Sequence, residues 1–99
     1  MTECQLQLEN GKLHLRGVLD KNSVPAAYQC SQQLLRRQQA PDTIELSAVE
    51  HIDSAGLALL LEWQSWAKHR QHALKLEHAP QQLLMLARLS ELDRILNLD

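Results

Sequence analysis

The stretch His51-Ile52-Asp53-Ser54-Ala55-Gly56-Leu57 joins an apolar segment to a long amphipathic pattern that predicts a helix. Ser54 stands at this junction, where its side chain is expected to cap the helix, and Asp53 is either a second cap or a turn residue. The N–H groups at a helix start carry a partial positive charge, so they favour a phosphate, a carboxylate or a partner's polar group. The junction is therefore where local structure and candidate chemistry coincide.

The residues at the beginning of the chain predict a hairpin and then a helix. Apolar and polar residues alternate over residues 3–18, and Asn10-Gly11 divides this run with a two-residue turn signal, which predicts a β-hairpin. A helix over residues 24–38 follows, with Asn22 or Ser23 as its cap. The inner face of this helix is expected to carry Ala27, Cys30, Leu34 and Leu35.

A short strand is predicted between this helix and the junction. Ala40-Pro41-Asp42 ends the helix, and the alternation from Thr43 to Leu46 is typical of a strand. Val49 and Ile52 are expected to anchor a loop beyond it. That loop then leads into the junction.

Beyond the junction the pattern predicts two more helices and one more strand. The first helix runs from Ala55 to about Arg70, a short strand covers residues 73–77, and Pro80 opens the second helix. The tail over residues 89–98 is expected to close the core as a short helix or a turn. The order of elements indicates an α/β fold with a mixed four-stranded sheet packed by about four helices.

The helix after the junction is apolar on two sides. One face, which should form the core, carries Leu57, Leu60, Leu61 and Ala67. A second stripe, at i, i+4 and i+7 spacing, carries Leu59, Trp63 and Trp66. Such a helix either packs inside its own domain, here against the helix over residues 24–38, or binds a partner. Tryptophan is enriched at the centres of interfaces, so both interpretations stay open.

The composition indicates one domain over residues 1–99. Apolar residues make up 44% of the sequence, enough for one core, and the formal net charge is −2 with both signs interspersed. No basic patch for nucleic acid is present, and the longest apolar run, Leu57 to Leu61, is far too short to span a membrane. Cys4 and Cys30 lack the spacing of a metal or redox pair and are interpreted as small buried or half-buried hydrophobes. No export signal is visible, so the expected location is the cytoplasm.

No residue pattern indicates catalysis. His69 and His72 lie three apart, but no cysteine or acidic residue completes a metal-ligand set with them, which favours solvated surface histidines. No nucleophile–base pair and no phosphate-binding Gly-Lys loop is visible. We therefore expect a chain that is not an enzyme and that uses no cofactor, no metal and no small-molecule substrate.

The junction and the order of elements resemble the STAS domain family over nearly the whole chain. The family motif is an Asp, a Ser or Thr, one small variable residue and then Gly-Leu, which the five residues from Asp53 to Leu57 match. The resemblance implies a single STAS domain. This family includes the anti-sigma-factor antagonists, domains of sulfate transporters and a small subunit of the bacterial Mla phospholipid ABC transporter.

The resemblance points to two branches of the family, the antagonists and the transporter subunit, and they imply different roles for Ser54. In the antagonists the residue after the Asp accepts a phosphate from a partner kinase, which makes Ser54 the candidate phosphoacceptor. The chain departs from the antagonists at Ala55, where they usually place a second Ser or Thr. The continuation from Gly56 to Leu61 and the segment over residues 84–92 are closer to the transporter subunit.

The transporter branch implies a cytoplasmic STAS subunit that supports an ATPase, in a complex with an integral membrane permease. That complex moves phospholipid to maintain outer-membrane lipid asymmetry. No nucleic acid and no direct insertion into the membrane are expected. Gly56 is expected to let another backbone, or a partner, approach the helix start closely. The expected partner contact comprises Asp53, Ser54, Ala55, Gly56, Leu59, Trp63 and Trp66.

Overall fold

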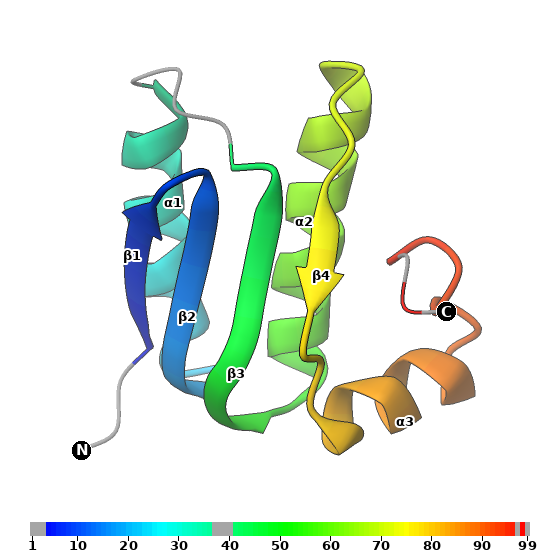
Figure 1. The fold of residues 1–99 in the computed structure, drawn as a ribbon. Coiled ribbons are helices and arrows are strands. Elements are labelled where there is room, and N and C mark those ends of the chain that lie inside the picture. The colour runs from blue at the N-terminus through cyan, green and yellow to red at the C-terminus, as the bar shows by residue number, and fades with distance from the viewer. Residues whose placement is uncertain (1–3, 37–40, 97, 99) are drawn as a thin grey trace.

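A four-stranded mixed sheet lies at the centre of the molecule (Figure 1). The computed structural model describes residues 4–36, 41–96 and 98. In sheet order the strands are β1 (Gln5–Glu9), β2 (Lys12–Leu19), β3 (Thr43–Ile52) and β4 (Lys75–Glu77). β1 is antiparallel to β2, whereas β2, β3 and β4 are parallel to one another. The predicted mixed α/β sheet is therefore confirmed.

The turn between β1 and β2 explains why the hairpin forms where the sequence predicts it. Asn10 and Gly11 adopt φ values of 52° and 78°, the left-handed region that two-residue hairpin turns require. Asparagine and glycine tolerate this region better than other residues do. The register that follows places Glu9 opposite Lys12 beside the turn.

Three helices occur in the described part of the chain, against an expectation of about four. They are α1 (Val24–Arg36), α2 (Ser54–His69) and α3 (Gln81–Leu89). α1 and α2 lie on one face of the sheet, and α3 lies at its end below β4 (Figure 1). The tail after α3 forms turns over residues 90–96 and buries Leu96 completely, which confirms that it closes the core. Residues 37, 38 and 40 of the predicted first helix and break lie outside the described residues.

The loop predicted around Val49 and Ile52 was wrong, because β3 continues to Ile52. The parallel pairing of β2 with β3 extends as far as Leu19 opposite Ile52. Register shifts interrupt this pairing at two places, so the second half of β3 shows no clean alternation of buried and exposed residues. A pattern search for alternation therefore ends the strand too early.

The core lies between the sheet and its two covering helices. β2 and β3 contribute inward leucines and isoleucines, and α2 buries Leu57, Leu60 and Ala67 as predicted, while Leu61 is half-buried. In α1, Ala27 is buried but Cys30 is exposed, so Cys30 was wrongly placed on the inner face. Cys4 is half-buried and packs against the core, as expected.

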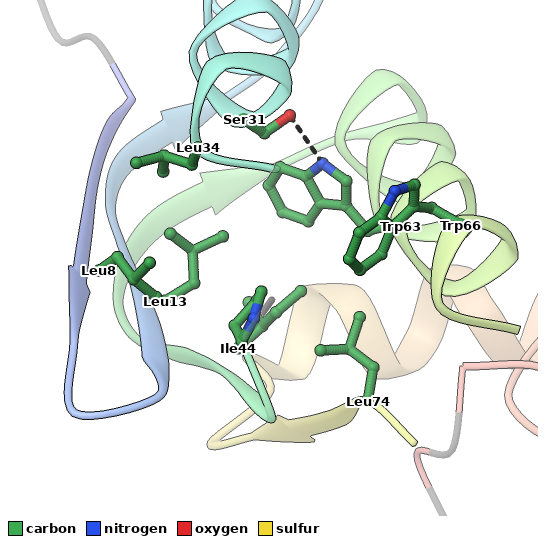
Figure 2. A pocket seen from close by; sticks show the side chains of 9 residues that line it. Leu8, Leu13, Ser31, Leu34, Ile44, Trp63, Trp66 and Leu74 are labelled. Carbon is green, nitrogen blue, oxygen red and sulfur yellow. Dashed lines mark hydrogen bonds between the residues drawn. The ribbon is translucent and has the colours of Figure 1, made fainter. Parts of the chain in front are cut away.

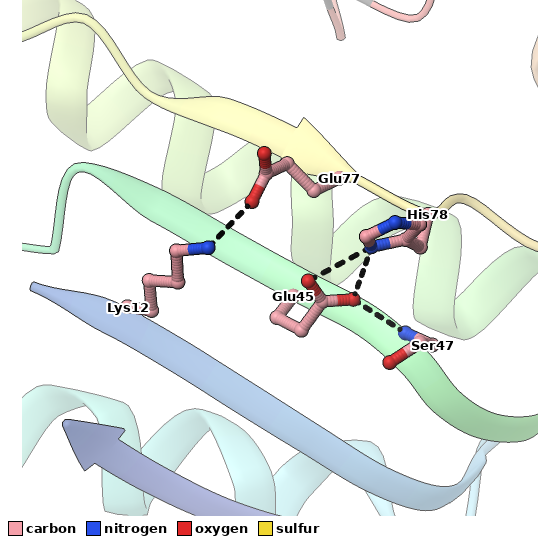
Figure 3. Close-up of polar contacts among 5 residues, drawn as sticks. All are labelled: Lys12, Glu45, Ser47, Glu77 and His78. Carbon is pink, nitrogen blue, oxygen red and sulfur yellow. Dashed lines mark hydrogen bonds and ion pairs between the residues drawn. The ribbon is translucent and has the colours of Figure 1, made fainter. Parts of the chain in front are cut away.

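The opposite face of the sheet is polar (Figure 3). Lys12 Nζ lies 3.1 Å from Glu77 Oε1, which links β2 to β4 across β3. Both carboxylate oxygens of Glu45 lie 2.9 Å from His78 Nδ1, and Oε1 also accepts a hydrogen bond from the Ser47 amide. Side chains on this face of the sheet are therefore joined by ion pairs and hydrogen bonds, and no helix of the described residues covers it (Figure 1).

Glu45 should give the fold a pH-dependent contribution to stability. Burial opposes its ionisation, but the hydrogen bonds from His78 and Ser47 outweigh burial and hold the pKa of Glu45 below its ordinary 4.5. A carboxyl whose pKa is lowered by folding stabilises the fold above its ordinary pKa, and this contribution is lost as the pH falls through the lowered value. We therefore expect the unfolding free energy of the natural chain to fall more steeply below about pH 5 than that of Glu45→Gln. Urea denaturation at several pH values measures both slopes, and equal slopes would contradict this account.

Candidate partner-binding site at the start of helix α2

Three loops meet at one edge of the sheet. β2, β3 and β4 are parallel, so each leads towards the same edge and into the next helix. β2 and β3 end together at Leu19 and Ile52, whereas β4 ends earlier, at Glu77 opposite Glu45, and residues 78–80 continue from it to α3. In α/β proteins the crevice outside the carboxyl ends of parallel strands is the usual place for a binding site. The junction predicted from the sequence is the middle one of these three loops.

Asp53, not Ser54, caps α2. One carboxylate oxygen of Asp53 accepts hydrogen bonds from the amides of Ala55 at 2.8 Å and Gly56 at 3.3 Å. Asp53 has extended backbone angles, φ −119° and ψ −165°, whereas Ser54 is already the first helical residue. A capping side chain must come from the last non-helical residue, so the position decides which of the two polar residues caps.

Ser54 is consequently left with its side chain on the surface. It is exposed, and among the described residues its hydroxyl makes no hydrogen bond. The amides of Ala55 and Gly56 are already occupied by Asp53, so the anion expected at this helix start is the carboxylate of Asp53 itself. The exposed hydroxyl is therefore the group at this edge that remains available to a partner or to an enzyme that modifies it.

Gly56 is required because α2 starts against the end of β2. A Cβ on Gly56 would lie 2.5 Å from Ile52 Cγ1 and 2.9 Å from the carbonyl oxygen of Leu19. The amide of Asp53 also donates a hydrogen bond to that same carbonyl, at 3.1 Å. Gly56 is itself buried, so it is not a surface contact, and the close approach of another backbone is confirmed.

The loop after β2 is held by its own hydrogen bonds. Asp20 Oδ1 accepts from the amides of Asn22 and Ser23, and the hydroxyl of Ser23 donates to the carbonyl of Val18. The amide of Ser23, and then that of Asn22, hold the pKa of Asp20 below its ordinary value. Ser23 was expected to cap the helix, but its side chain instead ties the loop to the end of β2.

Gln82 joins α3 to the end of β3. Its side-chain oxygen accepts a hydrogen bond from the Ile52 amide at 3.2 Å, and its nitrogen lies 3.2 Å from His51 Nδ1. Both Gln82 and His51 are exposed, so they border the surface around Ser54. Neither Asp20 nor Gln82 was singled out in the sequence. The available signal was topological, since each of them follows a strand of the parallel set.

Leu59 and Trp63 were wrongly assigned to the partner surface. They are only 2% and 4% exposed, and Trp63 Nε1 donates a hydrogen bond to Ser31 Oγ of α1 at 3.0 Å (Figure 2). Both residues fill the space between α2, α1 and the sheet, which confirms the alternative that the stripe packs inside the domain. Trp66 is half-buried, with the Arg70 guanidinium 4.6 Å from its ring centre.

The cavity beneath the two tryptophans is too small for an organic ligand. It has a volume of about 20 Å³ and apolar walls (Figure 2). No group of three or more metal-ligating side chains gathers in residues 4–36, 41–96 and 98. Over those same residues no helix is long and apolar enough to cross a membrane.

The chain is thus a small α/β domain with an Asp-Ser pair where β3 leads into α2. Asp53 caps α2, and Ser54 is exposed. A family model described as "Mlab, STAS domain" matches residues 3–97. The chain therefore belongs to the STAS domain family, as the motif and the order of elements predict. A comparison with curated proteins found no match.

Solved structures share the fold at low sequence identity. The unphosphorylated anti-sigma factor antagonist SpoIIAA superposes with a TM-score of 0.71 at 20% identity, over 92% of this chain and 83% of that one. An anti-sigma factor antagonist from Mycobacterium paratuberculosis gives 0.67 at 20% identity, over 95% and 81%. The structure of Mglu gives 0.60 at 22% identity, over 78% of this chain and 20% of that one. These likenesses show the fold.

Substitution of Gly56 tests the close approach at the helix start. Helix propensity alone would make Gly56→Ala stabilising by about 1 kcal/mol. The clash with the backbone of Leu19 should reverse the sign, and we expect a net loss of about 2 kcal/mol in the free energy of unfolding. Urea denaturation measures this difference. A more stable Gly56→Ala variant would contradict the geometry described above.

Proposed function

We propose that the chain is a non-enzymatic, partner-binding STAS domain whose contact surface is centred on Ser54. One observation carries the proposal: Asp53 caps α2, so Ser54 does not. The Ser54 hydroxyl is exposed and makes no hydrogen bond among the described residues. The surface extends to Ala55, which is half-buried, and to His51 and Gln82, and it leaves out the buried Gly56, Leu59 and Trp63.

One specific role is that of an anti-sigma-factor antagonist regulated by phosphorylation of Ser54. The likeness to two solved antagonists supports it. The geometry supports it too, because a kinase can reach the exposed hydroxyl. A phosphate there would bring nearly two negative charges beside the Asp53 carboxylate, which would change partner binding more than the fold.

The other specific role is that of a cytoplasmic subunit bound to the ATPase of a phospholipid ABC transporter, in a complex with an integral permease. The description of the matching family model, which names Mlab, supports this role. So does Ala55, which stands where the antagonists usually have a second hydroxyl residue. In this role the ATPase hydrolyses ATP, and the STAS domain supplies the docking surface.

A substitution at Ser54 tests the shared part of the proposal. Ser54→Arg should leave the fold intact, because the side chain is exposed, and should abolish co-purification of the partner from native cells. Ser65→Arg is the matched control, since Ser65 is also an exposed serine of α2 but lies towards its other end. Circular dichroism checks the fold of both variants. Retention of the partner by Ser54→Arg would contradict the site.

The same co-purification separates the two specific roles. An ATPase and an integral permease in the eluate would assign the transporter role, whereas a kinase that phosphorylates this chain would assign the antagonist role. Intact-mass spectrometry after incubation with ATP and that kinase should then show one phosphate on the natural chain and none on Ser54→Ala.

A further inference from the structure

The two cysteines, far apart in sequence, lie on neighbouring elements. Cys4 immediately precedes β1, is half-buried and packs against the core together with Leu6 and Leu8. These three residues alternate along the strand, so they share the face that α1 covers. Cys30 lies in the second turn of α1 and is exposed.

Both cysteines line one surface cleft. Its lining includes Cys4 and Leu6 from the strand side and Ala26, Ala27 and Cys30 from α1, and it extends along β1 and β2 as far as Ala48 of β3. Ala26 and Ala27 precede Cys30 by one helical turn, so the three lie along one side of the helix, where its buried residues border its exposed ones. β1 and α1 also run in the same direction and begin at the same end of the sheet (Figure 1). The beginning of the strand therefore lies beside the first turns of the helix.

We propose that Cys4 and Cys30 form a dithiol site that a small disulfide such as glutathione disulfide oxidises to an intramolecular disulfide. The chemistry needs no metal and no other residue. Within the described part of the chain, both cysteines are free thiols. The proposal is independent of the function proposed for Ser54, which lies at a different loop.

The different exposure of the two thiols sets the order of the exchange steps. Burial, and then the proximity of Cys30, raise the pKa of Cys4 to about 11, so the exposed Cys30 reacts first. The Cys30 thiolate attacks glutathione disulfide, which forms a mixed disulfide and releases one glutathione thiolate. The Cys4 thiolate then attacks the Cys30 sulfur, which forms the protein disulfide and releases the second glutathione. Two protein thiols are thus oxidised while one glutathione disulfide is reduced to two thiols.

The disulfide would fasten the edge strand to α1. Within residues 4–36, 41–96 and 98, β1 is the edge strand of the sheet and pairs only with β2. Cross-linking two positions far apart in the sequence restricts the unfolded chain and stabilises the fold. We expect the Tm of the oxidised chain to exceed that of the reduced chain by about 10 °C, and dithiothreitol to reverse the change.

Intact-mass spectrometry of the full chain after incubation with glutathione disulfide tests the proposal. The expected main product is a monomer that has lost the mass of two hydrogen atoms, with a peptide in which Cys4 is linked to Cys30. Cys4→Ser should stop at the mixed disulfide and carry one glutathione, on Cys30. Cys30→Ser should remain largely unmodified.

Two outcomes would overturn the proposal. In one, the natural chain keeps a glutathione on Cys30 while Cys4 stays a thiol, which would mean that the sulfur atoms cannot meet. In the other, the disulfide joins two chains, as non-reducing gel electrophoresis would show. Because the first readout is a mass and not a loss of folding, neither variant has to be as stable as the natural chain.

Discussion

The two hydrogen bonds from the start of α2 to the Asp53 carboxylate are the interaction on which the rest of the site depends. They occupy the amides of Ala55 and Gly56 and fix the residue at which the helix begins. The Asp53 amide is bonded to the carbonyl of Leu19, so the helix start is tied to the end of β2 as well. With both groups of Asp53 engaged, Ser54 becomes the first helical residue and its hydroxyl faces no internal partner among the described residues.

This arrangement explains why the five-residue motif has its particular composition. The acidic residue caps, the hydroxyl residue is presented at the surface, and the glycine allows α2 to begin against Leu19 and Ile52. Each position has its own physical reason, and only the second leaves a functional group unused. These residues, Asp53-Ser54-Ala55-Gly56-Leu57, lie within the segment that matches the STAS family model.

Most of the fold could be predicted from local patterns. Asn10-Gly11 located the hairpin, and the alternation around it gave the inward leucines of β1 and β2. The end of β3 could not be predicted, because the register shifts opposite β2 destroy the alternation there. The three helices and the closing tail were foreseen in outline, although the tail forms turns rather than a fourth helix.

The site was predicted in part, and its errors have a common cause. Periodicity shows that α2 is apolar on two sides, but it does not show what covers the second side. In the structure α1 covers it, and Trp63 donates a hydrogen bond to Ser31 of α1. Likewise Gln82 and Cys30 come near Ile52 and Cys4 only through the packing of elements, which sequence spacing does not show. Local patterns located Asp53 and Ser54, but they did not show that the helix begins at Ser54, which makes Asp53 the cap.

The most direct test of the account compares the unfolding free energies of Asp53→Ala and Ser54→Ala by urea denaturation. If Asp53 is the cap, its variant should lose about 1 kcal/mol, while Ser54→Ala should stay within about 0.5 kcal/mol of the natural chain. The reverse order, with the larger loss at Ser54, would mean that the serine hydroxyl is engaged in the fold. That result would contradict the claim that it is free for a partner.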